Sequence, residues 1–157
     1  MRIRADEHVS ERIVDAIINM ALGENFELSS VVRCGDRSKS DVHWIKSFAN
    51  EGGKAILSGD TDFFLRPHQV MAVCQCGLMV VHMPARWSNA KCHLQAAHLL
   101  MWWGRIEAAL ANGRPPQCFR PAWNISERGA VERVRIDYES ARKKLRKAAR
   151  GSRRREE

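Results

Sequence analysis

Four acidic side chains follow directly after two short segments that have the pattern of β-strands. Asp6 and Glu7 follow the strand that opens the chain, and Asp60 and Asp62 follow the strand that ends at Ser58. Carboxylates held close together repel one another, which raises their pKa values unless a cation lies among them. Oxygen-only clusters of this kind bind Mg²⁺ or Mn²⁺ in proteins. The pattern therefore predicts a divalent-metal site.

These acids can meet only if the two strands are parallel members of one sheet. In an α/β fold, the carboxyl ends of parallel strands lie at the same edge of the sheet, where ligands bind. Asp41 stands at the first turn of a helix that follows another predicted strand, so we expect it at this edge too. The positive end of the helix dipole favours a carboxylate there.

Strands and helices alternate along the first half of the chain. Strands are expected over residues 2–6, 26–32, 54–58 and 77–83, and helices over residues 11–22, 41–50 and a short segment that ends at Cys74. The run 77–83 is almost continuously apolar, which is typical of a central strand covered on both faces. The alternation predicts an α/β fold with a parallel sheet and right-handed crossovers.

The second half predicts a long helix, two further strands and a basic tail. Apolar residues recur every three or four positions over residues 89–111, which indicates an amphipathic helix. Residues 118–125, interrupted by Pro121, predict an edge strand, and residues 131–136 predict another. The tail has helical composition and is expected to fray at Gly151. We therefore expect a domain over residues 1–136 and an appendage over residues 137–157.

The positive charge is concentrated in this tail. The net charge is +8, and residues 140–157 hold nine of the 26 basic residues and two of the 18 acidic ones. The tail thus carries +7 and the rest of the chain +1. Such a polycation is drawn to nucleic acid or to another acidic partner. A solvated or disordered end is an equally open interpretation.

Composition excludes several other classes of protein. A chain of 157 residues with 45% apolar and 28% charged residues indicates an ordinary soluble domain. We see no run of about 20 apolar residues and no signal peptide, so we expect no membrane span and a cytoplasmic location. The five cysteines are scattered and match neither a disulfide framework nor the paired spacings of a zinc site. Buried reduced thiols are the better interpretation.

Three motifs together resemble a known family. They are the opening Arg-Ile-Arg-Ala-Asp6-Glu7-His8-Val9-Ser10, the Ser40-Asp41 helix start, and Ser58-Gly59-Asp60-Thr61-Asp62-Phe63. Their order and spacing resemble a PIN-like domain over about residues 1–85. The branch that they resemble has a DEN-type N-terminus and a DxDF motif, and it includes VapC-like toxins of toxin–antitoxin pairs. His8 departs from the asparagine usual in that branch.

The resemblance implies a three-layer α/β/α fold with a central parallel sheet, here followed by the basic helical tail. It implies that the catalytic, metal-binding acids are Asp6, Asp41, Asp60 and Asp62, with Glu7 as an auxiliary acid. It further implies a cytoplasmic ribonuclease that uses Mg²⁺ or Mn²⁺, is often a homodimer, and is held in check by an antitoxin protein. A metal-activated water would hydrolyse the RNA phosphodiester.

Basic and aromatic residues near these motifs are candidates for RNA contacts. Arg37, Lys39 and Arg66 flank the acidic loops, and Arg66 follows the second acidic pair by only four residues. We predict that these three contact phosphate. Trp87 and the Trp102-Trp103 pair could stack on bases. Helical spacing places Trp103 in the core, and none of the three is assigned to the site.

Two other functions remain open from the sequence. The Asp60-Thr61-Asp62 loop after an apolar strand also resembles the nucleophile loop of haloacid-dehalogenase-like phosphatases, although that reaction leaves Asp6 and Asp41 without roles. An inactive PIN-like module that binds RNA or protein is the other alternative. Each acid alone is explained by loop chemistry or helix capping. Only their predicted convergence on one sheet edge favours a site.

Overall fold

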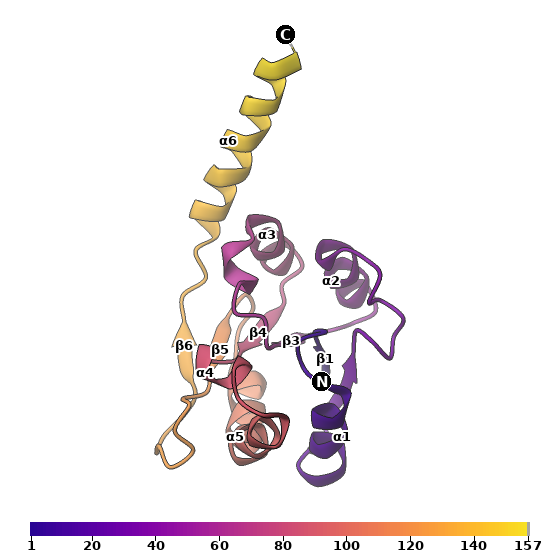
Figure 1. Ribbon diagram of the computed structural model, residues 1–157, viewed down its shortest axis with the longest axis vertical. Coiled ribbons are helices and arrows are strands. Elements are labelled where there is room, and N and C mark those ends of the chain that lie inside the picture. Colours follow the sequence, from indigo (N-terminus) through magenta and orange to yellow (C-terminus); the bar gives the residue numbers. More distant parts are fainter. Residues whose placement is uncertain (157) are drawn as a thin grey trace.

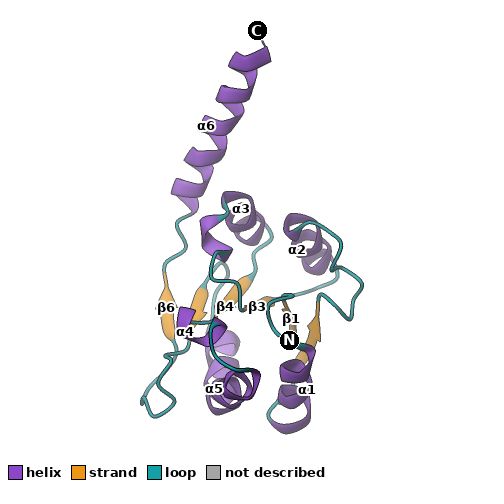
Figure 2. Ribbon diagram, viewed as in Figure 1, coloured by secondary structure: helices purple, strands orange, loops and turns teal. Residues whose placement is uncertain are grey.

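A six-stranded sheet lies between two layers of helices (Figures 1 and 2). The structure is a computed structural model that describes residues 1–156, with side chains to residue 152. The strands are β1 (Arg2–Ala5), β2 (Glu27–Ser30), β3 (Ala55–Ser58), β4 (Met79–His82), β5 (Cys118–Arg120) and β6 (Glu132–Val134). The helices are α1 (Glu11–Met20), α2 (Asp41–Asn50), α3 (Pro67–Gln75), α4 (Ala85–Ser88), α5 (Cys92–Asn112) and α6 (Tyr138–Glu156), with a 3-10 helix, η1, over Phe63–Leu65.

The order of the strands in the sheet is β2-β1-β3-β4-β5-β6. All neighbouring strands are parallel except β5 and β6, which are antiparallel. The chain moves outward from β1 to β2 and then crosses back to β3. The space between the carboxyl ends of β1 and β3 is therefore the switch point at which α/β proteins bind ligands. The predicted parallel sheet is confirmed.

Two separate apolar clusters join the helices to the two faces of the sheet. One face packs against α1 and α5, and the other packs against α2 and α3 (Figure 2). Side chains alternate between the faces along each strand, so Leu57 lies in the first cluster and its neighbour Ile56 in the second. Every residue of β4 is buried, as expected for a central strand. The result is the predicted three-layer α/β/α architecture.

Two predicted elements differ from the observed ones. The long helix begins at Cys92 rather than residue 89, and the separate helix α4 precedes it. The turn between them is closed by Trp87 and Gln95, because each side chain donates a hydrogen bond to the other's backbone carbonyl, at 3.1 and 2.8 Å. The predicted edge strand, β5, is instead an interior strand between β4 and β6. It ends at Arg120 because Pro121 has no N–H to continue the ladder.

Helix α6 leaves the body of the molecule and projects away from it (Figure 1). It packs against α3, and Ala141, the fourth residue of α6, is buried. The expected fraying at Gly151 is wrong, because the helix continues to Glu156. The Ser152 hydroxyl donates to the Ala148 carbonyl and so stays within the helix.

The antiparallel direction of β6 determines where α6 begins. Because β6 runs back along β5, α6 begins beside the amino ends of the parallel strands, at the edge opposite the carboxyl ends of β1 and β3. In the described part of the chain, no helix has the length and apolar character needed to cross a membrane.

The core between the sheet and α5 predicts a large effect of one substitution. Trp103 is fully buried and its indole N–H donates to Glu107 at 2.7 Å. We expect Trp103→Ala to lower the free energy of unfolding by about 3–5 kcal/mol, because it leaves a cavity. Met101 lies on the same helix and is 59% exposed, so Met101→Ala should change stability by less than about 0.5 kcal/mol. Urea denaturation of both variants measures the difference, and equal effects would contradict this packing.

Candidate functional site

Strands β1 and β3 end side by side and place two buried acids at the switch point. The backbone N–H of Asp6 donates to the Leu57 carbonyl at 2.9 Å, which extends the pairing of the two strands by one residue. Asp60 follows β3 after one intervening glycine. The two acids are only 5% and 6% exposed. Buried carboxylates require hydrogen bonds or a positive charge. Both are present here, as hydrogen-bond donors around the two acids and as the guanidinium of Arg66 beside Asp60.

Hydrogen bonds hold the carboxylate of Asp6 in place. It accepts from the Ser58 hydroxyl, from the backbone N–H of His8 at 3.0 Å, and from that of Gly59 at 3.3 Å. Burial raises the pKa of Asp6, and these hydrogen bonds together with the charge of His8 oppose that rise. A cation close to this carboxylate would stabilise its ionised form.

Asp60 is held through both its side chain and its backbone. Its carboxylate accepts from the backbone N–H of Asp62 at 2.9 Å and from the Arg66 guanidinium at 2.6 Å. Its carbonyl accepts from Nε2 of His82 at 2.8 Å, and Nδ1 of His82 accepts from Arg120 at 2.7 Å. Burial lowers the pKa of His82, and Arg120 acts in the same direction. The neutral histidine thus fixes the backbone of the acidic loop.

Asp41 joins these acids from the start of α2. The Ser40 side chain caps this helix by accepting from the backbone N–H of His43 at 3.3 Å, and Asp41 occupies its first turn. The Asp41 carboxylate accepts from Nε1 of Trp44 at 3.2 Å and from the side-chain amide of Gln69. The Arg66 guanidinium lies 3.6 Å from this carboxylate as well as 2.6 Å from that of Asp60. One arginine therefore bridges two of the predicted site acids.

A buried arginine, which the sequence analysis did not single out, anchors the loop that leads to α2. Arg4 in β1 lies 3.3 Å from Asp36 and 3.2 Å from Glu51, and its guanidinium stacks on the ring of Phe48 at 4.6 Å. Asp36 is buried and is also paired with Lys39 at 2.7 Å. The only signal in the sequence is a charged residue between two apolar ones in a strand, which requires a buried partner.

A small cavity of about 20 Å³ lies among most of the predicted residues. Its walls include Asp6, Glu7, Asp41, Asp60, Arg37 and Lys39, and also Asp36, which the sequence analysis missed. The space accommodates about one water molecule or one ion. Arg66 reaches the same acids through its salt bridges. Asp62 is exposed and does not line the cavity, so the structure separates it from the other three predicted catalytic acids.

The carboxylate oxygens at this cavity are the type of ligand that Mg²⁺ and Mn²⁺ prefer. These carboxylates are spaced more widely than the ligands of a complete metal site. Among the side chains that the structure describes, no three from acidic residues, histidine or cysteine are grouped closely enough to form a metal-binding cluster. Arg66 instead supplies the positive charge between Asp41 and Asp60.

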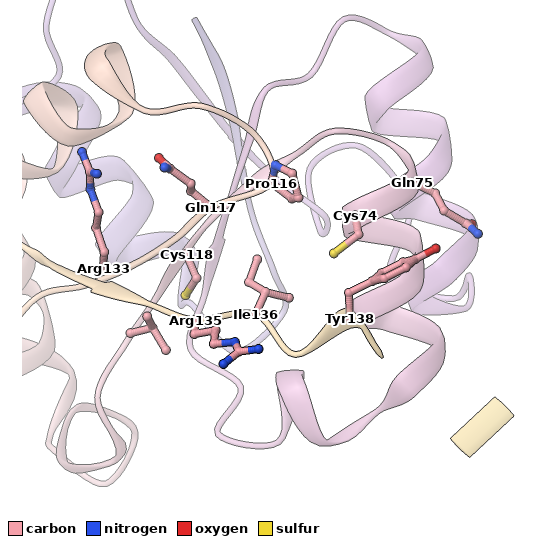
Figure 3. A pocket seen from close by; sticks show the side chains of 10 residues that line it. Cys74, Gln75, Pro116, Gln117, Cys118, Arg133, Arg135, Ile136 and Tyr138 are labelled. Carbon is pink, nitrogen blue, oxygen red and sulfur yellow. The ribbon is translucent and has the colours of Figure 1, made fainter. Parts of the chain in front are cut away.

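A larger cavity, whose lining side chains are drawn in Figure 3, lies at the opposite edge of the sheet. It has a volume of about 700 Å³ between the end of α3, the start of β5, and the segment that joins β6 to α6. Cys74, Cys118, Ile136 and Tyr138 are among its lining residues, and no acidic residue lines it. Burial raises the pKa of Cys118 to about 12, so that side chain is a thiol rather than a nucleophilic thiolate. This cavity therefore offers none of the chemistry predicted from the acids.

Comparison with known proteins gives one match. A family model described as a PIN like domain matches residues 1–85, which contain β1 to β4 and the acids at the switch point. No curated protein and no solved structure matches the chain.

The anchoring role of Arg4 predicts a strong coupling with Asp36. We expect Arg4→Met to lower the free energy of unfolding by about 3–5 kcal/mol, because it leaves Asp36 buried without its main partner. Adding Asp36→Asn to this variant should recover part of that loss. Arg2→Met removes a half-exposed arginine from the same strand and should cost less than about 1 kcal/mol. Urea denaturation of the wild type, Arg4→Met, Asp36→Asn and the double variant gives the coupling energy. Strictly additive effects would contradict the anchor.

Proposed function

The chain belongs to the PIN-like domain family, whose members are generally nucleases, and on this premise we propose that it is a metal-dependent endoribonuclease. The observation that carries the proposal is the meeting of Asp6 and Asp60 at the switch point, with Asp41 in the wall of the same small cavity. PIN-like domains generally use divalent metals, and the carboxylate oxygens here are of the kind that Mg²⁺ and Mn²⁺ prefer.

In this proposal Asp6, Asp41 and Asp60 hold the ion. Asp62, which is exposed in the same loop as Asp60, is the fourth metal-binding acid of the proposed site. Glu7 acts as an auxiliary acid in the wall of the cavity. The bound ion would lower the pKa of a water molecule and neutralise charge on the phosphate. His82, by holding the Asp60 carbonyl, keeps the acidic loop in position.

Arg66 is the residue that we propose to contact the phosphate to be cleaved. Its guanidinium already lies between the carboxylates of Asp41 and Asp60. A guanidinium binds phosphate with the same fork of N–H groups that it offers to a carboxylate. Arg66 can therefore exchange one acid for the RNA backbone. Arg37 and Lys39 in the cavity wall add positive charge along that path.

The finer assignment rests on the motifs. We propose that this is the cytoplasmic toxin of a toxin–antitoxin pair, held in check by an antitoxin and acting as a homodimer. The observation in support is the resemblance of the Asp6-Glu7 and Asp60-Thr61-Asp62-Phe63 segments to the VapC-like branch. We also propose that residues 1–136 form the nuclease domain and that residues 137–157 capture RNA by charge. The projecting basic helix α6 supports this division.

An inactive PIN-like binding module is the second candidate, and one observation favours it. Arg66 already neutralises Asp41 and Asp60 without a metal. A module that binds RNA or protein would keep these salt bridges permanently, whereas a nuclease must open them to admit the ion. The phosphatase alternative has less support, because Asp6 shares the switch point with Asp60 and has no role in that reaction.

Loss of either switch-point acid tests the proposed activity. We expect Asp60→Asn and Asp6→Asn to abolish Mn²⁺ binding in calorimetry, since each removes a charged ligand. RNA cleavage should fall further than the roughly 10- to 100-fold that loss of an outer-shell partner costs. Asp15→Asn changes an exposed acid on α1 and should alter neither measurement. Full cleavage in both switch-point variants would refute the assignment, and no Mn²⁺ binding by the wild type would favour the inactive module.

The basic helix predicts a salt-dependent contribution to RNA binding. Deleting residues 140–157 removes nine basic residues and should weaken binding and flatten its dependence on salt, because fewer counterions are released. A full-length control that changes Lys143, Lys144, Arg146 and Lys147 to Gln keeps the buried Ala141 and should show the same trend. Fluorescence anisotropy at several salt concentrations measures both. An unchanged slope would show that α6 does not contact RNA.

A further inference from the structure

A second cavity lies at the same edge of the sheet as the acids. It has a volume of about 500 Å³ and is lined mainly by Arg86, Leu94, His98, Trp123, Asn124 and Ile125, which we call the α5 pocket. All of these residues lie beyond the segment matched by the family model. We propose that the α5 pocket binds a nucleobase of the RNA strand and thereby selects the position at which the RNA is cut. This inference rests on the proposed nuclease function.

Helix α4 connects the α5 pocket to the acidic loop. The Ser88 hydroxyl donates to the Gly59 carbonyl at 2.7 Å, one residue before Asp60. The Trp87 ring packs so closely on Gly59 that a Cβ at this position would lie 2.7 Å from the ring. Arg86, the preceding residue, lines the α5 pocket. The α5 pocket therefore lies beside the place where the acids would hold a phosphate of the RNA, on the α5 side of the sheet.

The α5 pocket contains an aromatic surface. The Trp123 and His98 rings are nearly parallel, with centroids 5.2 Å apart and an angle of 17° between the planes. Among the residues that the structure describes, Trp123 is the only tryptophan that is not buried; the other four belong to the core. Stacking of a base on an aromatic side chain is the common means by which proteins bind unpaired RNA. Leu94 and Ile125, 46% and 43% exposed, extend this apolar surface.

One polar group beside this surface suits the edge of a base. Asn124 accepts the Ser126 N–H through its Oδ1 at 3.0 Å, which leaves its NH₂ group to donate. His98 is 2% exposed and supports the Trp123 ring from beneath, because its Nε2 donates to the Ala122 carbonyl at 2.6 Å and so fixes the imidazole against the indole. An amide donor beside a supported aromatic ring is complementary to an acceptor on a nucleobase.

Other occupants fit these observations less well. A protein partner or a second copy of this chain would cover Leu94 and Ile125, but it gives no reason for a histidine-supported indole ring beside an amide donor. Arg86 adds a positive charge at the pocket, which suits the phosphate attached to a base. The positive charge, the aromatic ring and the amide donor together favour a nucleotide.

The test uses the full-length protein with AMP, GMP, CMP and UMP in EDTA, so that neither metal nor cleavage is involved. We expect saturable binding in calorimetry and quenching of tryptophan fluorescence that is lost in Trp123→Leu, whereas ribose 5-phosphate and inorganic phosphate should produce neither. Trp123→Leu should weaken binding by about 5- to 150-fold, the effect of losing one stacked base. Asn124→Ala changes an exposed residue and should alter the order of preference among the four nucleotides. Met101→Ser, on the same helix but outside the pocket, should leave binding unchanged.

The outcomes separate this inference from the proposed nuclease. Nucleotide binding by a wild type that cleaves no RNA with any metal would support the pocket and refute the nuclease. If Asp60→Asn abolishes cleavage while Trp123→Leu and Asn124→Ala leave nucleotide binding unchanged, the nuclease stands and the pocket is refuted. Sedimentation of Trp123→Leu provides a further check. A changed association state with unchanged nucleotide binding would identify this surface as a protein interface and overturn the proposal.

Discussion

The site depends on one constraint, the parallel pairing of β1 with β3 at the point where the strand order reverses. That pairing continues through the backbone of Asp6, so the carboxylate of Asp6 is held where the chain of β3 turns toward Asp60. Ser58 donates its hydroxyl proton to Asp6 and accepts the backbone N–H of Asp60, and so links the two acids through one side chain. A one-residue shift in register would turn these side chains to other faces of the sheet. The sheet thus determines the distance between the acids.

Two arginines neutralise the acids around the switch point, and their burial explains why their roles differ. The Arg4 side chain is 3% exposed, stacks on Phe48 and holds Asp36, so moving it would leave charges buried without partners. The Arg66 side chain is 46% exposed and holds Asp41 and Asp60 from the solvent side. An exposed ion pair contributes little to stability and exchanges partners readily. Arg4 therefore fixes the fold, and Arg66 is free to release its acids to a cation and a phosphate.

The residues whose place at the switch point could be expected from sequence belong to local patterns. The apolar strand before Asp60 and the capped helix start at Asp41 are each readable within a few residues, and the topology that joins them follows from strand and helix alternation. The role of Asp36 could not be predicted, because an acid in a turn is ordinary until Arg4 is known to face it. Asp62 was predicted from its place after a strand and from the family resemblance, but the chain enters η1 there, so Phe63 is buried and Asp62 is exposed. Trp123 lies two residues after Pro121 and carries no periodic signal.

In the proposed nuclease, the positions of α6 and of the acids separate RNA capture from RNA cleavage. The acids lie at the carboxyl ends of the parallel strands, whereas α6 begins beside their amino ends, and a four-residue strand spans about 13 Å. The basic helix therefore begins too far from the acids to neutralise them or to compete with a divalent ion for them. In the proposal, its charge attracts the extended RNA backbone instead, since that attraction requires no fixed geometry. The groups that require precise placement, Asp6, Asp60 and the α5 pocket, all depend on strand ends and on α4, which packs against them.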